Sequence, residues 1–533
     1  MSRGESHADP RAGRRTVGID LGTSRSAVAV IGADGEPVIV PIPAGGSWVP
    51  SVVTLAGSGD EPEILVGARA HRAAAARPED TVTAFKRLIG RRFDDDEVQR
   101  LARALPYQVI AAPNGDAWAQ ARGVALSPPW LSALVLRELV GAAEAWLGEP
   151  VRDAVITVPA RFDIEQRRAT RDAAEIAGLQ VRRLINEPTA AALGVGAHRG
   201  ADQRLAVCDL GAGTFDVSIV NVEEGVIEVL ASAGDSFLGG EDVDRILADC
   251  LVDEIRQQHG LDVTSDPPSL QRLLDECRTA KHRLSQQARA EIALVLAVGS
   301  SAPLEYRRTV RRDELEFWIE STLDLLEPPC MEAAARCGLR PGDVDSLILV
   351  GGSARIPAVQ HKLAGVFGRA PRVIGQREVV ALGAARLAAM LDGDHEEVAV
   401  LDVTARAIGV DLGDGKYQQV IARNTAVPTR EHKVVATIRA DQRELELDVY
   451  EGESPAIADN RLLGRFVCSG LSDGPAGHVM VAFDFTVDVD GLLRVSASEM
   501  GGGGNSHPEL RLRATAGLTR AHVERMRAAL AGG

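Results

Sequence analysis

The chain has 533 residues and a formal net charge of −16, with 45% hydrophobic and 25% charged residues. This composition is typical of folded proteins and excludes a wholly disordered chain, and the length predicts about three to four domains of roughly 150 residues. The negative charge argues against broad electrostatic binding of nucleic acid or of an anionic membrane surface.

The distribution of cysteine, histidine and apolar residues narrows the class of protein. Six cysteines are spread along the chain without a CxxC pair, and the 11 histidines show no metal-ligand spacing. We therefore expect reduced thiols and a cytoplasmic protein. Residues 1–15 are polar, which predicts a disordered tail rather than a signal peptide. Apolar runs such as Ile292–Val298 are too short to cross a bilayer, so no membrane partner is expected.

From Thr16 to Leu391, apolar segments typical of strands alternate with segments typical of helices. Such alternation predicts an α/β architecture. The strand segments include Val17–Asp20, Ala154–Val158, Leu205–Asp209 and Leu347–Val350, and the helical segments include Trp130–Leu147 and Ile164–Ala177.

Two segments of this region resemble each other. Gly18–Thr23 and Cys208–Thr214 each contain the end of an apolar strand followed by Asp, Leu, Gly and Thr. Two copies about 190 residues apart suggest a duplicated fold whose halves face each other across a cleft. One such loop alone is more often an ordinary strand turn, whereas two copies favour a binding site.

The residue types in these loops suit a triphosphate and its metal ion. Glycine lets backbone N–H groups approach an oxyanion closely, and the hydroxyls of Thr23, Ser24 and Thr214 add donors. Asp20 and Asp209 stand at strand ends, where they can hold Mg²⁺ through water. The GxxxxGK[ST] pattern is absent, so this is a different kind of phosphate loop.

Other residues are candidates for the same binding site, but their sequence patterns are less specific. Gly351-Gly352 follows an apolar strand and fits either a nucleoside site or a tight turn, and Gly239-Gly240 is weaker still. Lys86 is one of five lysines in a chain whose cations are nearly all arginine, which favours a site that needs a compact ammonium. Glu187 precedes a helical segment and is either a helix-capping acid or a residue that orients metal and water.

The pattern changes after Leu391. Residues 392–397 are acidic and polar, and an apolar tetrad at Val398–Leu401 precedes Asp402. The tetrad is either a linker that docks onto another surface or the first strand of the next domain, and spacing alone leaves both open.

From Asp402 to Ala516 the pattern is that of strands. Glu444–Val449 alternates strictly between polar and apolar residues. Val479–Val489 also alternates, meets a turn signal at Asp490-Gly491, and is followed by a further strand at Leu492–Ala497. This region predicts an all-β domain.

Several segments in the same order resemble the heat shock protein 70 (DnaK-type) chaperone family, from about Thr16 to Leu530. The resemblance implies a duplicated, actin-like (ribonuclease H-like) α/β ATPase domain followed by an all-β sandwich that binds extended peptides. The segments are VGIDLGTSRS (17–26), FKRLIGRRF (85–93), AVITVPARF (154–162), INEPTAAAL (185–193), DLGAGTFDVS (209–218), FLGGEDVD (237–244), VGGSARIP (350–357), VAVLDVT (398–404), NTAVPT (424–429) and DVDGLLRVSAS (488–498).

The resemblance also implies the division of the chain. We expect a tail (1–15), an ATPase domain (16–391), a linker (392–401), a sandwich (402–516) and a short helical stub (517–533) in place of the family's helical lid. Thr519 is suited to cap that stub. Because a lid slows peptide release, its absence predicts rapid peptide exchange.

The implied cofactor is ATP with Mg²⁺. Asp20, Glu187 and Asp209 would orient the waters of Mg²⁺, and Lys86 would assist the attack of water on the γ-phosphate. Thr214 would act with these catalytic residues. Nucleotide contacts would come from Gly22, Thr23, Ser24, Gly211, Gly213 and Thr214 at the phosphates, from Gly239 and Gly240, and from Lys281, His282, Ser285, Gly351, Gly352 and Arg355 around the adenosine.

Further positions match the family's coupling and peptide residues. Pro159 and Arg167 match residues that relay the nucleotide state, Leu401 lies in the implied docking linker, and Arg183 and Asp402 match an interdomain contact. The implied partners are unfolded polypeptide, a J-domain co-chaperone and a nucleotide exchange factor. The implied peptide pocket is Val410, Val435, Leu445, Leu447 and Val479, for which the alternative is a place in the sandwich core.

The chain departs from the family at several positions. Ala212 replaces a glycine of the second phosphate loop, Arg161 replaces an aromatic residue, and Gly413 lacks the bulk expected over a bound peptide. Arg278 and Arg377 stand where acids are usual near the adenine. Turnover, base preference and peptide affinity therefore stay open.

Three functions fit these residues to different degrees. The first is an ATP-dependent chaperone with slow hydrolysis, and the second is an ATP-sensing adaptor that has lost turnover. The third is a sugar or metabolite kinase on the same duplicated fold, against which the linker and the β domain argue.

Overall fold

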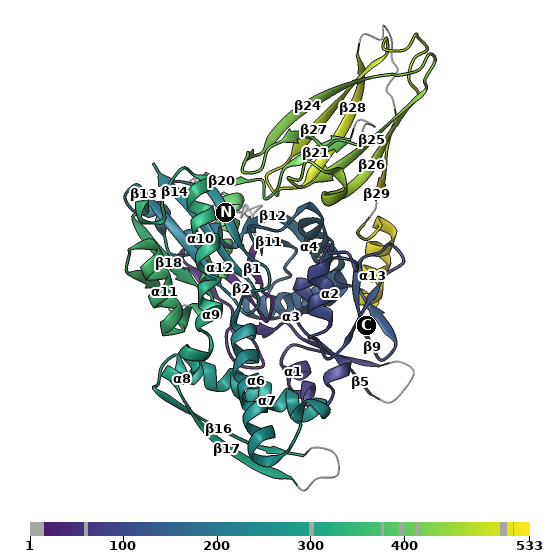
Figure 1. Cartoon of the computed structure of the whole chain (residues 1–533). Coiled ribbons are helices and arrows are strands. Elements are labelled where there is room, and N and C mark those ends of the chain that lie inside the picture. The colour runs from purple at the N-terminus through teal and green to yellow at the C-terminus, as the bar shows by residue number, and fades with distance from the viewer. Residues whose placement is uncertain are drawn as a thin grey trace, which may run out of the picture.

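The structure, a computed structural model, describes residues 15–57, 62–297, 303–374, 378–393, 399–411, 415–500, 509–514 and 516–532. Most of the expected tail, part of the expected linker (394–398), Arg377 and Gly413 lie outside these ranges. Helices and two large sheets form the larger part of the molecule, and two further sheets extend from one end of it (Figure 1). The molecule is thus mixed α/β with a β-rich C-terminal part, as the residue patterns predict.

The first large sheet has the strand order β12-β11-β1-β2-β3, and β4 also pairs with β2. Its central strand β1 is parallel to β11 and antiparallel to β2. Val17, Ile19 and Leu21 of β1 share one face and are buried, and on the other face Gly18 lies against the backbone of α12. The strands are β1 (Val17–Leu21), β2 (Arg25–Ile31), β3 (Pro37–Ile39), β4 (Val49–Pro50), β11 (Asp153–Val158) and β12 (Gln180–Asn186).

The second large sheet has the order β19-β18-β13-β14-β15-β20-β23. Here β13 is parallel to β18 and antiparallel to β14, the same arrangement that surrounds β1. The duplication predicted from the two similar segments is therefore present in the local strand pairing. The strands are β13 (Gln203–Leu210), β14 (Phe215–Glu223), β15 (Val226–Asp235), β18 (Ser346–Val350), β19 (Pro371–Val373), β20 (Val400–Val403) and β23 (Ala426–Val427).

Two helices join the large sheets. Helix α12 (Val379–Asp392) packs on the first sheet, α5 (Glu187–Gly194) packs on the second, and the two helices contact each other. The contact is close because Gly383 of α12 meets the carbonyl of Ala190, where a Cβ atom would clash. This packing fixes the start of α5, and with it Glu187, between the two sheets.

The remaining helices cover the outer faces. Helices α3 and α4 lie on the first sheet, and α10 lies on the second. Helix α4 begins with a capping box in which Asp163 accepts from the N–H of Gln166. The helices are α1 (Ala68–Ala74), α2 (Asp96–Ala102), α3 (Pro128–Leu147), α4 (Ile164–Ile176), α6 (Gly240–His259), α7 (Pro267–Leu284), α8 (Arg312–Trp318), α9 (Glu320–Asp324), α10 (Glu327–Arg336) and α11 (Pro357–Phe367).

Three small sheets complete the α/β part. They have the orders β6-β5-β7, β10-β9-β8 and β16-β17. Their strands are β5 (Val53–Ala56), β6 (Glu63–Val66), β7 (Thr81–Val82), β8 (Gln108–Ala111), β9 (Ala117–Ala121), β10 (Val124–Leu126), β16 (Arg289–Leu296) and β17 (Leu304–Arg311).

The C-terminal part is a sandwich of two antiparallel sheets, with orders β22-β21-β25-β26-β29 and β24-β27-β28. The predicted alternation is confirmed in β25, whose residues alternate between exposed and buried positions. The predicted turn is also present, because the N–H of Asp488 donates to the carbonyl of Leu492 around Gly491 (φ 75°). The strands are β21 (Ile408–Asp411), β22 (Gln418–Ile421), β24 (Thr429–Ala436), β25 (Glu444–Glu451), β26 (Arg461–Ser469), β27 (Met480–Val487), β28 (Leu493–Met500) and β29 (Glu509–Ala514).

Strand β20 connects the two parts. Its first residues, Val400 and Leu401, pair in parallel with Ile227 and Glu228 of β15, and its last residues, Asp402 and Val403, pair antiparallel with β23. The apolar tetrad before Asp402 was compatible with a docking linker or with a strand, and here its described end is a strand that docks on the second large sheet.

Helix α13 (Arg520–Gly532) follows the end of β29 and lies against α4 and α3 on the outside of the first large sheet (Figure 1). The hydroxyl of Thr519 accepts from the N–H of His522, which confirms the predicted cap. Leu518 and Val523 are buried against Trp130 and Ile176. Among the residues that the structure describes, no helix combines the length and apolarity needed to cross a bilayer.

Candidate nucleotide-binding cleft

The two similar loops lie in one cleft between the large sheets. The loop at 22–24 connects β1 to β2, and the loop at 211–214 connects β13 to β14. Both line a cavity of about 540 Å³, a size suited to a small-molecule ligand. The two loops thus line one cavity, an arrangement consistent with duplicated halves that face each other across a cleft.

Most of the residues proposed for the nucleotide site line this cavity. They come from both large sheets, from the turn that carries Lys86, and from α5, α6 and α7. They are Asp20, Gly22, Thr23, Ser24, Lys86, Glu187, Asp209, Gly211, Thr214, Gly240, Lys281, His282, Gly351 and Gly352.

Four proposed residues do not line the cavity, and three of them support its wall. The carbonyl of Gly213 accepts a hydrogen bond from Arg87. Gly239 precedes α6, and its N–H donates to Asp242 at 2.7 Å. Ser285 follows α7, and its hydroxyl donates to the carbonyl of Lys281 at 3.1 Å. Arg355, the fourth, ends a short 3₁₀ turn after Gly352.

Acidic side chains concentrate at the bottom of the cleft. Burial and, to a smaller extent, the neighbouring Glu187 raise the pKa of Asp20 to about 7. Burial also raises the pKa of Asp209, with additional repulsion from Glu187 and Asp216. Carboxyls that repel each other in a buried site are stabilised in their ionised form by a cation, so this donor set fits Mg²⁺.

These carboxylates fit a hydrated Mg²⁺ ion, which they would hold through its water ligands rather than by direct coordination. Within the described ranges, no cluster of three or more His, Cys, Asp or Glu side chains is arranged to bind a metal directly. Coordination through water, the arrangement expected for Asp20, Glu187 and Asp209, does not need such a cluster, because Mg²⁺ dehydrates reluctantly.

Lys86 faces Glu187 across the cleft. Its Nζ atom lies 2.6 Å from Oε1 of Glu187, and the lysine residue is only 5% exposed. The ammonium also lies 5.6 Å from the centre of the Phe162 ring. Glu187 is the first residue of α5, and its side chain lines the cleft. The two roles considered from the sequence, an acid at a helix start and a residue that orients metal and water, are therefore compatible.

The third glycine cluster packs directly on the second loop. Gly351 has φ 87°, and a Cβ atom there would clash with the carbonyl of Leu210 and with Asp209. Gly352 has open space at the same position. The hydroxyl of Ser353 donates to the carbonyl of Gly211 at 2.8 Å. Only glycine at position 351 allows this close approach of β18 to the loop.

Lys281 is held at the opposite wall. Its Nζ donates to the carbonyl of Gly240 at 2.6 Å and lies 2.7 Å from Asp244. Burial lowers the pKa of Lys281, and Asp244 opposes that shift. Arg278, one of the departures from the family, also pairs with Asp244, at 3.3 Å. Arg278 thus shares Asp244 with Lys281, and it also lies 3.9 Å from Asp275.

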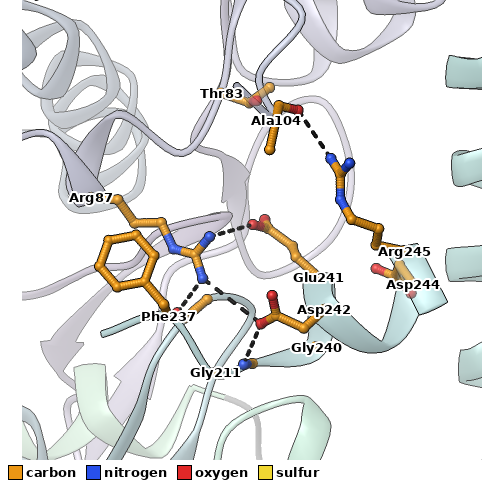
Figure 2. A network of polar contacts seen from close by, with 12 residues as sticks. Thr83, Arg87, Ala104, Gly211, Phe237, Gly240, Glu241, Asp242, Asp244 and Arg245 are labelled. Carbon is orange, nitrogen blue, oxygen red and sulfur yellow. Dashed lines mark hydrogen bonds and ion pairs between the residues drawn. The ribbon is translucent and has the colours of Figure 1, made fainter. Parts of the chain in front are cut away.

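Arg87 joins the two halves of the cleft and was missed from the sequence. Figure 2 shows its guanidinium beside the Phe237 ring and pointing to Glu241 and Asp242. The ion-pair distances are 3.8 Å to Glu241 and 3.9 Å to Asp242, and Arg87 also donates to the carbonyl of Gly213. Two features of the sequence could have indicated this residue. Arg87 directly follows Lys86, and the two acids that it pairs with directly follow Gly240.

The junction with the sandwich contains the predicted coupling residues. Arg167 is buried and donates to Asn186 at 2.7 Å, next to Glu187, and to the carbonyl of Asp490 at 3.3 Å. Pro159 directly follows β11, and its carbonyl accepts from the N–H of Phe162. Arg167 thus connects Asn186, the residue before Glu187, to the sandwich through direct hydrogen bonds.

The contact expected between Arg183 and Asp402 is replaced by two others. Arg183 lies 3.7 Å from Asp490, and Asp402 accepts a hydrogen bond from Thr189 of α5 at 2.9 Å. Arg183 and Asp402 therefore each contact the other part of the molecule, but through partners other than each other. Asp490 also accepts from the N–H of Leu184 at 2.9 Å, so its carboxylate forms the centre of this contact.

A second junction contact was also missed. Arg461 of β26 lies 2.5 Å from Asp163, the N-cap residue of α4, and donates to the carbonyl of Gly90 at 2.5 Å. The carbonyl of Gly90 and the cap of α4 belong to the α/β part, so this arginine anchors the sandwich to it. The pair is separated by 298 residues, and no local pattern indicates it.

The five residues proposed for a peptide pocket all belong to the sandwich interior. Four are buried, and Val435 is half-buried against the same core cluster. This packing is what the core interpretation predicts, and the pocket stays a prediction. The residues are Val410, Val435, Leu445, Leu447 and Val479.

Comparison with known protein families gives a match over nearly the whole chain. A family model described as Hsp70 protein matches residues 16–531. The matched range includes both phosphate loops, strand β20, the two sheets of the sandwich and most of α13. The resemblance inferred from short segments thus agrees with a match that spans them all.

Proposed function

The chain belongs to the Hsp70 family, and we propose that it is a chaperone of this type that binds ATP with Mg²⁺, hydrolyses the ATP slowly and so regulates its binding of extended apolar peptides. The observation that carries the proposal is the single cleft that brings together two glycine loops, three carboxylates and Lys86. The family match supports the chaperone class, and the cleft supports the ATPase activity.

The proposed chemistry assigns each group of the cleft one task. Backbone N–H groups of the two loops, with the hydroxyls of Thr23, Ser24 and Thr214, bind the phosphates. When bound through Asp20, Glu187 and Asp209, Mg²⁺ supplies charge neutralisation. Phosphoryl transfer depends mainly on positioning and on stabilisation of developing negative charge, so one fixed ammonium contributes strongly.

Lys86 and Glu187 form the centre of this proposal. The 2.6 Å contact fixes the Lys86 ammonium in a site with little water. There it stabilises negative charge on the γ-phosphate and orients the attacking water. Glu187 in turn positions the ammonium, so its effect on catalysis passes partly through Lys86.

Coupling to the sandwich follows the junction contacts. Thr189 of α5, two residues after Glu187, donates to Asp402, and Arg167 connects Asn186 to Asp490. We propose that nucleotide-dependent movement at the start of α5 strengthens or weakens these contacts. Release of β20 and the sandwich then changes the affinity for peptide.

The wider assignment follows the family. We propose an actin-like ATPase domain at 16–391, a linker at 392–401, a peptide-binding sandwich at 402–516 and a helical segment from 517. The proposed partners are unfolded polypeptide, a J-domain co-chaperone and a nucleotide exchange factor, and the proposed location is the cytoplasm.

A second candidate function is an ATP-sensing adaptor without turnover. Ala212 and Arg278 motivate it, because both line the cleft and the methyl group of Ala212 adds bulk that a glycine would lack. In that case the junction still responds to ATP, but the nucleotide is not consumed.

ATP turnover measured with and without an apolar peptide separates the two functions. The chaperone proposal predicts slow hydrolysis that peptide stimulates and that Lys86→Ala removes. A folded protein that binds ATP without any turnover supports the adaptor. Ala212→Gly is the informative variant, because gain of turnover there assigns the loss to that methyl group.

A further inference from the structure

Glu451 is a buried carboxyl at the junction between the sandwich and the α/β part. It ends β25 and is 2% exposed. Its Oε1 atom accepts a long hydrogen bond of 3.4 Å from the N–H of Ile164, at the start of α4. Its Oε2 atom is buried without a hydrogen-bond partner among the described residues. A carboxylate so poorly supplied with donors is costly to bury.

The charged groups around Glu451 would compensate the negative charge of its ionised carboxylate only weakly. Asp163 faces it with the same sign, and Arg461 is already bound to Asp163 and to the carbonyl of Gly90. Arg406 acts from the loop before β21. The titratable and charged groups that face Glu451 are Asp163 and Glu165 at the start of α4, Arg167 on α4, Asp402 and Arg406 before β21, Tyr417, Glu453 and Arg461.

These surroundings favour the neutral form of the side chain. Burial and, to a smaller extent, repulsion by Asp163 raise the pKa of Glu451 to about 8. A neutral carboxyl removes the repulsion and needs fewer donors than a carboxylate. A small cavity lined by Glu451, Ile164 and Asp402 lies at the same place.

We propose that Glu451 carries a proton while the sandwich is docked on the α/β part and releases it to solvent when the two separate, so that docking weakens as the pH rises. The proposal rests on the proposed function only in assuming that the two parts separate. It adds a pH sensor to the junction, independent of nucleotide.

The sign and size of the effect follow from proton linkage. The docked state has a pKa of about 8, against 4.5 for an exposed glutamate, so docking takes up a proton between these values. Docking is therefore favoured at pH 6.5 and loses this contribution as the pH passes 8. Between pH 6.5 and 8.5 the docking equilibrium constant falls on the order of tenfold.

Small-angle scattering of the full chain without nucleotide tests the proposal. The wild type, Glu451→Gln and the control Glu446→Gln are measured at pH 6.5 and 8.5 and constant ionic strength. Glu446 lies on the same strand β25 but is half exposed, away from the junction. We expect the wild type and the control to expand at pH 8.5 and Glu451→Gln to stay compact. An equal expansion of all three proteins overturns the proposal.

A second measurement decides the case in which scattering detects no expansion. The carboxyl carbon of Glu451 is followed by NMR in a glutamate-labelled chain, and its signal is assigned by its loss in Glu451→Gln. A titration midpoint near 8 supports the proposal, and a midpoint near 4.5 overturns it. Neither readout uses ATP turnover, so failure here is distinct from failure of the proposed ATPase.

Discussion

The ammonium of Lys86 lies 2.6 Å from the carboxylate of Glu187, at the bottom of the cleft between the two large sheets. Lys86 belongs to the first half of the α/β part, and Glu187 begins the helix that leads to Thr189 and thus to Asp402 of strand β20. The ion pair of the proposed catalytic site and the Thr189–Asp402 contact therefore both involve the first turn of α5.

Lys86→Ala should abolish most ATP turnover while ATP still binds. The ammonium stabilises charge that develops in the transition state, so its removal is expected to lower the single-turnover rate by about 100-fold or more. Lys362→Ala is the matched control, because Lys362 is a surface lysine paired with Asp324 and Glu327. Equal rates for the two variants would show that Lys86 has no catalytic role.

Gly351→Ala should weaken nucleotide binding more than Gly352→Ala. A Cβ atom at position 351 meets the backbone of Leu210 and the side chain of Asp209, and its φ of 87° disfavours alanine, whereas position 352 is open. We expect ATP affinity to fall about tenfold in Gly351→Ala, a cost of about 1–2 kcal/mol. Fluorescent-nucleotide titration measures both, and similar affinities would contradict the packing described here.

Asp490→Asn should uncouple peptide from ATP turnover. The Asp490 carboxylate accepts from the N–H of Leu184 at 2.9 Å and from Arg171 at 2.6 Å, so loss of its charge weakens the junction by about 2–3 kcal/mol. Stimulation of turnover by apolar peptide should then disappear. The control is Asp484→Asn on β27, whose partner Arg430 also lies in the sandwich. Full stimulation in Asp490→Asn would be incompatible with this role.

Glu165→Gln should remove part of the pH dependence of stability. Burial raises the pKa of Glu165 to about 7 from 4.5, so the folded chain binds a proton that the unfolded chain loses. Stability contributed by this group is fully present below pH 4.5 and is lost as the pH rises to 7, by about 3 kcal/mol. Thermal melts at pH 8 should show a higher Tm for Glu165→Gln than for the wild type. The exposed neighbour Glu175→Gln should leave Tm unchanged.

Val523→Asp should detach α13. Val523 is 5% exposed and packs with Leu518 against α3 and α4, so a buried charge costs about 2 kcal/mol or more. Limited proteolysis should then cut within α13 faster than in the wild type. Arg520→Ala, at a 92% exposed side chain of the same helix, should be cut at the wild-type rate.

Local patterns predicted the parts of the site that are built from consecutive residues. Each phosphate loop is a strand, a glycine turn and a hydroxyl residue, and such short combinations fix their own geometry. Lys86 was identifiable because a lysine is unusual among the arginines of this chain. The alternation in β25 and the cap at Thr519 are also local, and both are present in the structure.

Contacts between distant segments could not be predicted in the same way. Asp490 is a turn residue by local pattern, and only the docking of the sandwich brings it to Arg171 and Leu184. The partner expected for Arg183 was Asp402, but Asp490 lies beside it instead. Such pairings depend on the placement of one whole part of the molecule against another, which single-residue patterns do not encode.

Calorimetric titration of the purified chain with ATP tests the central claim, that the two glycine loops and their carboxylates bind a nucleotide with Mg²⁺. We predict saturable binding of one ATP per chain, weakened when Mg²⁺ is removed by chelation and weakened again in Gly351→Ala. The absence of saturable heat with both ATP and ADP in the presence of Mg²⁺ would contradict the claim.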